Sequence, residues 1–211
     1  MAQILYPLFT LVYIGLLIWA IFLWFRGSSL SLAILFAVLV SLLYGNAVIG
    51  YGRFIGEGDL LLNMNQLRLL LNVLFVPFLL VAALNQARRF GVGLPNYPGL
   101  LVLLPLGIGL YEFMNRNMQV VDAGGTLRYV DVNGGIAFEL LVTLGITAVF
   151  AFLIWRKVQW PWLCLAALFL LVSTFLSLNN LTYIIISAAE ILLLLAFLFT
   201  EQKLKDIEEA R

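Results

Sequence analysis

The sequence contains no histidine, one cysteine (Cys164) and only three lysines, Lys157, Lys203 and Lys205. The absence of histidine excludes the Ser–His and Cys–His pairs of hydrolases and bis-histidine haem ligation, and it removes the usual imidazole ligands of zinc enzymes. A single cysteine excludes an internal disulfide and a CxxC redox pair. All three lysines follow long hydrophobic stretches and do not lie within them. None is therefore placed to form the Schiff base by which a seven-helix membrane protein could hold retinal at mid-membrane. What remains is carboxylate chemistry: proton relay, cation binding, or acid catalysis on an apolar substrate.

Charged residues of both signs are also scarce. They make up 11% of the 211 residues, whereas soluble domains carry about a quarter. Hydrophobic residues make up 64%, and the mean hydropathy is +1.07. A soluble fold of this size could not hide so much apolar surface, so the composition predicts an integral membrane protein. The net charge of +1 gives no electrostatic basis for binding nucleic acid, and we expect no nucleic-acid partner.

Seven hydrophobic stretches each approach the roughly 20 residues that a helix needs to cross a bilayer. They cover residues 3–25, 29–51, 64–86, 97–115, 134–155, 159–178 and 181–201. The first lacks a basic n-region and a cleavage site, so we expect a retained helix rather than a signal peptide. The sequence therefore predicts an all-α, polytopic membrane helix bundle. We expect one domain of seven transmembrane helices over residues 1–211. Its polar tail at 202–211 is expected to be a solvated helix end.

Lysine and arginine are distributed unevenly between the two sides of such a bundle. One side collects Arg53, Arg68, Arg116 and Arg128, and the other collects Arg26, Arg88, Arg89, Arg156, Lys157, Lys203, Lys205 and Arg211. The side richer in Lys and Arg is usually cytoplasmic. We therefore expect the N-terminus outside and the C-terminus in the cytoplasm.

The longest connection, residues 117–133, alternates polar and apolar residues on both sides of Ala123-Gly124-Gly125. This pattern is typical of a β-hairpin, here at 118–132, lying on the outer surface as a lid or rim. Isolated hairpins are only marginally stable. An ordinary structured loop is therefore the preferred interpretation, and the extramembrane hairpin is the alternative.

Polar residues within the stretches recur at helical spacing, so each set shares one face of its helix. The sets are Asn65, Arg68 and Asn72; Glu139, Thr143 and Thr147; and Tyr183, Ser187 and Glu190. Such residues usually face the bundle interior or a cavity, because contact with lipid is costly. At 1.5 Å per residue, Glu190 and Asn72 lie about 13 Å below the outer helix ends, and Arg68 and Glu139 about 6 Å. We therefore expect a cavity in the outer half of the membrane, closed below by hydrophobic packing.

The candidate ligand-binding residues are those that would line this cavity or its mouth. They are Arg53, Glu57, Arg68, Asn72, Glu112, Glu139, Tyr183, Ser187 and Glu190. Structural roles are the alternatives. Arg68 and Glu139 could form an ion pair that fixes helix register, and Glu190 could be protonated or paired with an arginine. For Glu112 a plain i,i+4 pair with Arg116 is preferred. The sequence identifies no catalytic residue, metal site or cofactor.

The run from Gly50 to Gly58 has two interpretations. Gly52 and Gly56 form a small-xxx-small pair suited to close helix contact, followed by a turn. Alternatively, the glycines expose backbone N–H groups to an anion, with Arg53 and Arg68 alongside. Because the spacing matches neither a P-loop nor a dinucleotide-binding motif, helix packing and a turn are preferred.

Four segments carry a resemblance that covers most of the chain: GRFIGEG at 52–58, LNMNQLRLLLNVLFVPFLL at 62–80, RKVQWPWL at 156–163 and AAEILLLLAFLFTE at 188–201. They resemble an uncharacterised family of small bacterial seven-transmembrane-helix proteins, of the type found in cyanobacteria. The resemblance implies the same topology, a bacterial inner or plasma membrane, and roles for Arg53, Glu57, Arg68 and Glu190. It implies no substrate.

Three hypotheses of function follow. The first is an integral membrane protein that binds or transports a small hydrophobic or amphipathic molecule, such as a lipid, quinone or pigment, with Glu190 and Arg68 as polar anchors. The second is a structural or assembly subunit of a larger membrane complex or homo-oligomer. The third is a carboxylate-dependent enzyme acting on a lipid or isoprenoid, with Glu190 or Glu139 as general acid. In each case the lipid bilayer is a partner.

Overall fold

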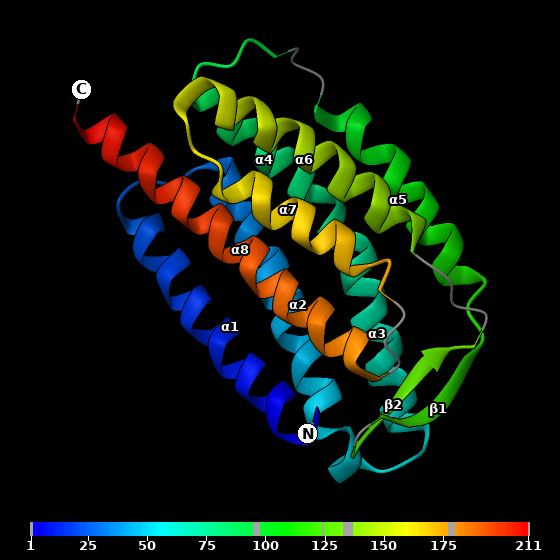
Figure 1. The fold of residues 1–211 in the computed structure, drawn as a ribbon. Helices are drawn as coiled ribbons and strands as arrows, with labels where there is room; N and C mark the ends of the chain where they lie inside the picture. The colour runs from blue at the N-terminus through cyan, green and yellow to red at the C-terminus, as the bar shows by residue number, and fades with distance from the viewer. Residues whose placement is uncertain (1, 95–97, 124, 133–136, 177–179, 211) are drawn as a thin grey trace.

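The structure is a computed structural model that describes residues 2–94, 98–123, 125–132, 137–176 and 180–210 (Figure 1). Helices dominate it, with one two-stranded sheet. The helices are α1 (Ala2–Phe25), α2 (Leu30–Ile55), α3 (Asp59–Phe75), the 3₁₀ turn η1 (Val76–Phe78), α4 (Leu79–Arg89), α5 (Pro98–Met114), α6 (Phe138–Val158), α7 (Trp162–Ser173) and α8 (Asn180–Glu209). The strands are β1 (Met118–Ala123) and β2 (Thr126–Asp131).

Five helical segments are long and apolar enough to cross a membrane, judged by length and composition; one of them, the third rod, runs through α3, η1 and α4. They are Gln3–Phe25, Leu30–Ile55, Asp59–Arg89, Phe138–Val158 and Thr182–Glu209. Two shorter apolar helices, Gly99–Met114 and Trp162–Ser173, lie among them. The prediction of a largely helical, multi-pass membrane protein is confirmed in this form. The exact number of crossings stays a prediction.

The third rod is interrupted at Pro77. Proline has no backbone N–H and crowds the preceding turn, so the α-helical ladder breaks there. The chain passes through the 3₁₀ turn η1, in which Pro77 is buried, and continues directly into α4. The rod extends beyond the predicted 64–86 because the helix begins at Asp59, before the hydrophobic run, and ends at Arg89.

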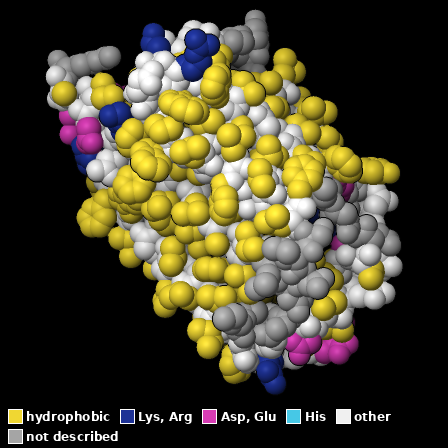
Figure 2. Space-filling model, in the orientation of Figure 1, with side chains coloured by type: hydrophobic (Ala, Val, Ile, Leu, Met, Phe, Trp, Pro, Cys, Tyr) yellow, Lys and Arg dark blue, Asp and Glu magenta, His cyan; other side chains and the backbone are white. Residues whose placement is uncertain are grey.

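The hydrophobic core lies between α1, α2, α4, α6, α7 and α8. Tyr13, Leu35, Leu144 and Phe197 are among its fully buried members. Helix α5 lies at one edge, against α6 and α3 (Figure 1). Outside this core, hydrophobic side chains cover the broad middle of the visible face and charged ones gather mostly near its two ends, as Figure 2 shows. An apolar surface of this extent suits contact with lipid rather than water.

The connection at 117–133 contains a β-hairpin. β1 and β2 pair antiparallel from Met118 with Asp131 to Ala123 with Thr126. Gly125 in the turn has φ +91°, a conformation that glycine adopts without strain. The preferred interpretation of an ordinary loop is therefore wrong. The hairpin is not isolated, because β2 packs against α2 and α3.

A glycine near the end of α2 allows strand β2 to pack closely against this helix. A Cβ atom added at Gly52 would collide with the backbone carbonyl oxygen of Leu127 in β2. Gly56 ends α2 with φ +81°, and its N–H donates to the Gly52 carbonyl at 3.0 Å. The predicted turn is present. The close contact at Gly52 is with a strand, however, rather than with the neighbouring helix that was expected.

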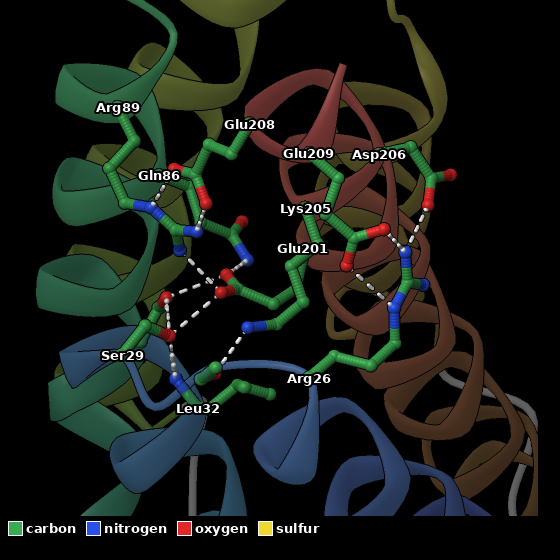
Figure 3. A network of polar contacts seen from close by, with 12 residues as sticks. Arg26, Ser29, Leu32, Gln86, Arg89, Glu201, Lys205, Asp206, Glu208 and Glu209 are labelled. Atoms are coloured by element: carbon green, nitrogen blue, oxygen red, sulfur yellow. Dashed lines mark hydrogen bonds and ion pairs between the residues drawn. The ribbon is translucent and has the colours of Figure 1, made fainter. Parts of the chain in front are cut away.

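Both ends of the bundle carry polar groups, but in different arrangements. The hairpin and the N-terminus lie at one end, called here the hairpin end, and the C-terminus lies at the opposite end, called the C-terminal end (Figure 1). At the C-terminal end, Glu201 of α8 is 0% exposed. Its carboxylate accepts hydrogen bonds from Ser29 and Ser31 at 2.7 Å each, from Gln86 at 3.0 Å, and from Arg89 (Figure 3).

The rest of the α8 tail continues this C-terminal network. Arg89 also pairs with Glu208 at 2.8 Å, and the Lys205 ammonium donates to the Gly27 carbonyl (Figure 3). Arg26 pairs with Glu209 at 2.8 Å and with Asp206 at 2.7 Å, and these carboxylates raise the pKa of the Arg26 guanidinium above its ordinary value. The tail is helical, and Asp206, Glu208 and Glu209 remain about half exposed, as expected for a solvated helix end. Lys205 departs from that expectation, because it is only 3% exposed and contacts the α1–α2 connection.

Candidate ligand-binding cavity

A cavity of about 1250 Å³ lies at the hairpin end, bounded by α3, α5, α6, β2 and the start of α8. It combines a polar pole with an apolar wall. The polar lining residues are Arg68, Glu112, Asn115, Arg116, Arg128, Asp131 and the rings of Tyr111, Tyr129 and Tyr183. Its apolar lining includes Leu69, Leu103, Leu104, Gly107, Ile108, Phe138 and Val142. We call it the arginine cavity, since three guanidinium groups share it.

The three arginines come from three different elements. Arg68 is in α3, Arg116 follows α5, and Arg128 is in β2. Arg68 lies close enough to Arg128 and Arg116 for their like charges to repel it, while the carboxylate of Glu190 attracts it. A concentration of positive charge at one pole of the cavity is the result.

Arg128 is held firmly although it lies in a hairpin. It is 3% exposed, and one terminal nitrogen lies 3.3 Å from the Tyr6 hydroxyl oxygen, to which it donates. Its guanidinium carbon lies 4.0 Å from the centroid of the Tyr183 ring, a cation–π contact. The Nε–H donors of Arg128 and Arg68 are both buried without a hydrogen-bond partner. Both arginines therefore keep unused donor capacity.

The position of Arg68 depends on a second glycine of α2. A Cβ atom added at Gly45 would lie 3.2 Å from Cγ of Arg68, tighter than most such contacts. The adjacent Tyr44 hydroxyl donates to the Met64 carbonyl at 3.3 Å, which ties α2 to α3 at this level. The close approach of α2 and α3 thus directs the arginine past the glycine.

The two carboxylates of the lining are engaged by backbone N–H groups. Glu112 accepts from the Phe138 N–H at 3.1 Å, and Asp131 accepts from the Asn117 N–H at 3.1 Å. The Phe138 N–H is one of the donors that the first turn of α6 leaves without an intrahelical partner, and a carboxylate there also complements the helix dipole. This competition explains why no ion pair of the described residues joins Glu112 to Arg116, the pair preferred from the sequence.

The apolar wall opens toward the surface of α5. Leu103 and Leu104 are 61% and 60% exposed while also lining the cavity. A Cβ atom added at Gly107 would meet nothing within 4 Å, so the space beside this glycine is free. The cavity is therefore continuous with the apolar face of the bundle.

Three of the nine predicted site residues line the arginine cavity: Arg68, Glu112 and Tyr183. Arg53 and Glu57 are exposed at the end of α2 and in the turn that follows it, outside the cavity. Asn72 lies deeper and accepts a hydrogen bond from the Ser41 hydroxyl at 2.9 Å. This hydrogen bond joins α2 to α3, so a structural role accounts for a polar side chain at position 72.

The remaining three predicted residues also lie outside the lining. Ser187 is buried and Glu190 half-buried on α8. Glu139 is turned toward α5, where a Cβ atom at Gly109 would collide with its Oε2, an oxygen that is buried without a hydrogen-bond partner. Among the ion pairs of the described residues none joins Arg68 to Glu139, so the pair proposed from the sequence is not formed.

Sequence reasoning missed Arg128, Arg116 and Tyr6. Arg128 was counted only as a loop charge. The strand alternation contains the relevant information, because Thr126 and Arg128, two residues apart, are both buried on one face of β2. Tyr6 could not be recognised, since nothing in its local pattern relates it to a hairpin some 122 positions away.

A second hollow of about 550 Å³ lies between α7 and α8. Its lining is apolar and aromatic, including Trp160, Trp162, Phe169 and Phe199. It offers no charged group, in contrast to the arginine cavity. Within the described ranges, no group of three or more Cys, Asp or Glu side chains is placed to hold a metal ion.

The fold and the cavity together define a helical membrane protein with an amphipathic cavity at one end of its bundle. Comparison of the chain with models of protein families, with curated proteins and with solved structures gives no match.

Proposed function

We propose that the protein binds a small amphipathic molecule in the arginine cavity, as a membrane carrier or receptor for a lipid, quinone or pigment. One observation carries the proposal: a cavity of about 1250 Å³ joins a pole of three arginines to an apolar wall that is continuous with the bundle surface. A molecule with one polar and one apolar end matches both parts at once.

The energetics support an occupant that brings its own polar group. Charged groups at membrane depth are usually paired or face a water-filled space, because transfer into hydrocarbon is costly. Here Arg68 lies within a hydrophobic stretch and is repelled by Arg128 and Arg116, and the Nε–H groups of Arg68 and Arg128 have no hydrogen-bond partner. A ligand head group would satisfy those donors, while its apolar part would lie against Leu103 and Leu104.

The same proposal includes the placement in the membrane. The two short helices complete seven crossings, the hairpin end faces the outside, and the C-terminal end faces the cytoplasm of a bacterial cell. The excess of Lys and Arg at the C-terminal end supports this orientation. A ligand would then enter the cavity from the outer leaflet, beside α5.

Native mass spectrometry of gently purified protein tests the function. Wild type should retain a bound small molecule. Gly107→Phe should lose it, because the new ring fills the free space beside α5. Gly15→Phe is the matched control, because a Cβ at that exposed α1 glycine also meets nothing within 4 Å and Gly15 is not among the residues that line the cavity. Equal retention by both variants, or bare wild-type protein, would contradict the proposal.

Bare protein would leave the structural or assembly role as the better account of the fold. The enzyme hypothesis gains no support from the cavity, because neither Glu139 nor Glu190 is among its lining residues.

A further inference from the structure

The polar pole of the arginine cavity brings together arginines from three separate elements. Arg68, Arg116 and Arg128 converge from α3, the end of α5 and β2. Each of them lines the cavity, and Arg68 interacts repulsively with both others. Guanidinium groups that line one cavity create a positive potential there, which favours a ligand of negative charge.

The acidic residues of the lining do not neutralise this pole completely. Glu112 and Asp131 accept hydrogen bonds from backbone N–H groups of Phe138 and Asn117. Three positive and two negative side chains give the residues that line the cavity a balance of +1, and Glu190, which also attracts Arg68, lies outside this lining.

Arg128 is preorganised for binding. Arg128 is buried and held between the Tyr6 hydroxyl and the Tyr183 ring, so its guanidinium does not need to be ordered when a ligand binds. Its Nε–H and that of Arg68 are buried, unpartnered donors. A buried donor without an acceptor is costly, and an anionic oxygen would remove that cost.

We propose that the ligand of the cavity is an anionic lipid with an exposed phosphate head group. Several arginines that approach from different directions suit the multiple oxygens of a tetrahedral phosphate, to which guanidinium forks bind strongly. The acyl chains lie along the apolar wall at Leu103, Leu104 and Ile108. This inference rests on the proposed function, because it specifies the amphipathic molecule that occupies the cavity.

Binding of defined lipids to the purified full-length protein tests this inference, read by native mass spectrometry and by the melting temperature. The probes are dioleoyl phosphatidic acid, dioleoylglycerol and inorganic phosphate. Phosphatidic acid should bind at least tenfold more tightly than dioleoylglycerol, which has the same chains without the phosphate. Equal binding of the two lipids would overturn the phosphate assignment while leaving the proposed function intact. Absence of binding by either lipid would overturn both.

Variants locate the head group. Arg128→Gln and Arg68→Gln should each lower the affinity for phosphatidic acid by about tenfold or more, the range expected for losing a charge-assisted hydrogen bond. Binding of dioleoylglycerol should not change. Arg156→Gln removes an exposed arginine at the other end of the bundle and should leave both affinities unchanged.

Two further outcomes keep the test decisive if Arg128→Gln fails to fold. The wild-type preference between the two lipids needs no variant, and Arg128→Lys keeps the charge while losing the guanidinium fork, so it should retain only part of the preference. Inorganic phosphate that binds as tightly as phosphatidic acid would overturn the lipid assignment, because the apolar wall would then contribute nothing.

Discussion

Glu201 shows how a single residue can be misjudged when its neighbours along the chain are the only guide. It stands at the boundary between a hydrophobic run and a polar tail, where a carboxylate is normally solvated. In the structure it is completely buried and accepts from Ser29, Ser31, Gln86 and Arg89. These partners are distant in sequence, and no local periodicity relates them to α8.

Removing the charge of Glu201 should therefore destabilise the protein. In Glu201→Gln the half-buried Arg89 loses its buried partner, and breaking such a pair costs about 3 kcal/mol in the free energy of unfolding. Glu208→Gln removes a half-exposed partner of the same arginine and should cost less than about 1 kcal/mol. Equilibrium unfolding in detergent micelles measures both, and equal effects of the two substitutions would contradict a buried anchoring role.

Of the two buried arginine donors in the cavity, Arg68 could be identified from the sequence and Arg128 could not. Arg68 could be selected from the sequence because a charge within a hydrophobic stretch is expensive and calls for a polar environment. Arg128 could not be selected in this way, since a charge in a connection carries no such penalty. Its burial follows from the docking of β2 on the bundle, which is a tertiary contact.

At the scale of elements, the helices follow from hydrophobic length, whereas the hairpin does not follow from its own stability. The alternation at 117–133 predicts two strands, but an isolated pair would be marginal. What adds stability is packing of β2 on α2, and that packing requires a residue without a side chain at position 52. Loop and hairpin could not be distinguished without knowing that this surface exists.

Gly52→Ala tests that dependence. The added methyl group would collide with the Leu127 carbonyl, so we expect β2 to be displaced, at a cost of about 1–3 kcal/mol. Limited proteolysis near the Gly125 turn should become faster than in wild type. Gly15→Ala, at an exposed helical glycine with open space, should leave the rate unchanged. An unaltered cleavage rate in Gly52→Ala would show that the hairpin is not held by this contact.

At the scale of the whole molecule, the distribution of positive charge predicts the orientation. The lone cysteine, Cys164, is buried, and replacing it by alanine provides a background for labelling. Gln119→Cys at the hairpin end should react with a membrane-impermeant maleimide on intact cells, because this position is exposed. Ala210→Cys should react only after the cells are lysed. The reverse pattern would invert the orientation, and labelling of both from one side would exclude an odd number of crossings between positions 119 and 210.

The bond between Ser31 and Glu201 joins residues 170 positions apart, and this separation has a consequence for biosynthesis. When α2 leaves the ribosome and enters the translocon, Ser31, and later Gln86 and Arg89, have no carboxylate to bind. Until α8 is made, water or another protein has to satisfy the hydrogen bonds of these side chains. Helix α8 therefore completes this polar network only after the earlier helices have been made. Insertion machinery that retains those helices would favour correct assembly of this chain.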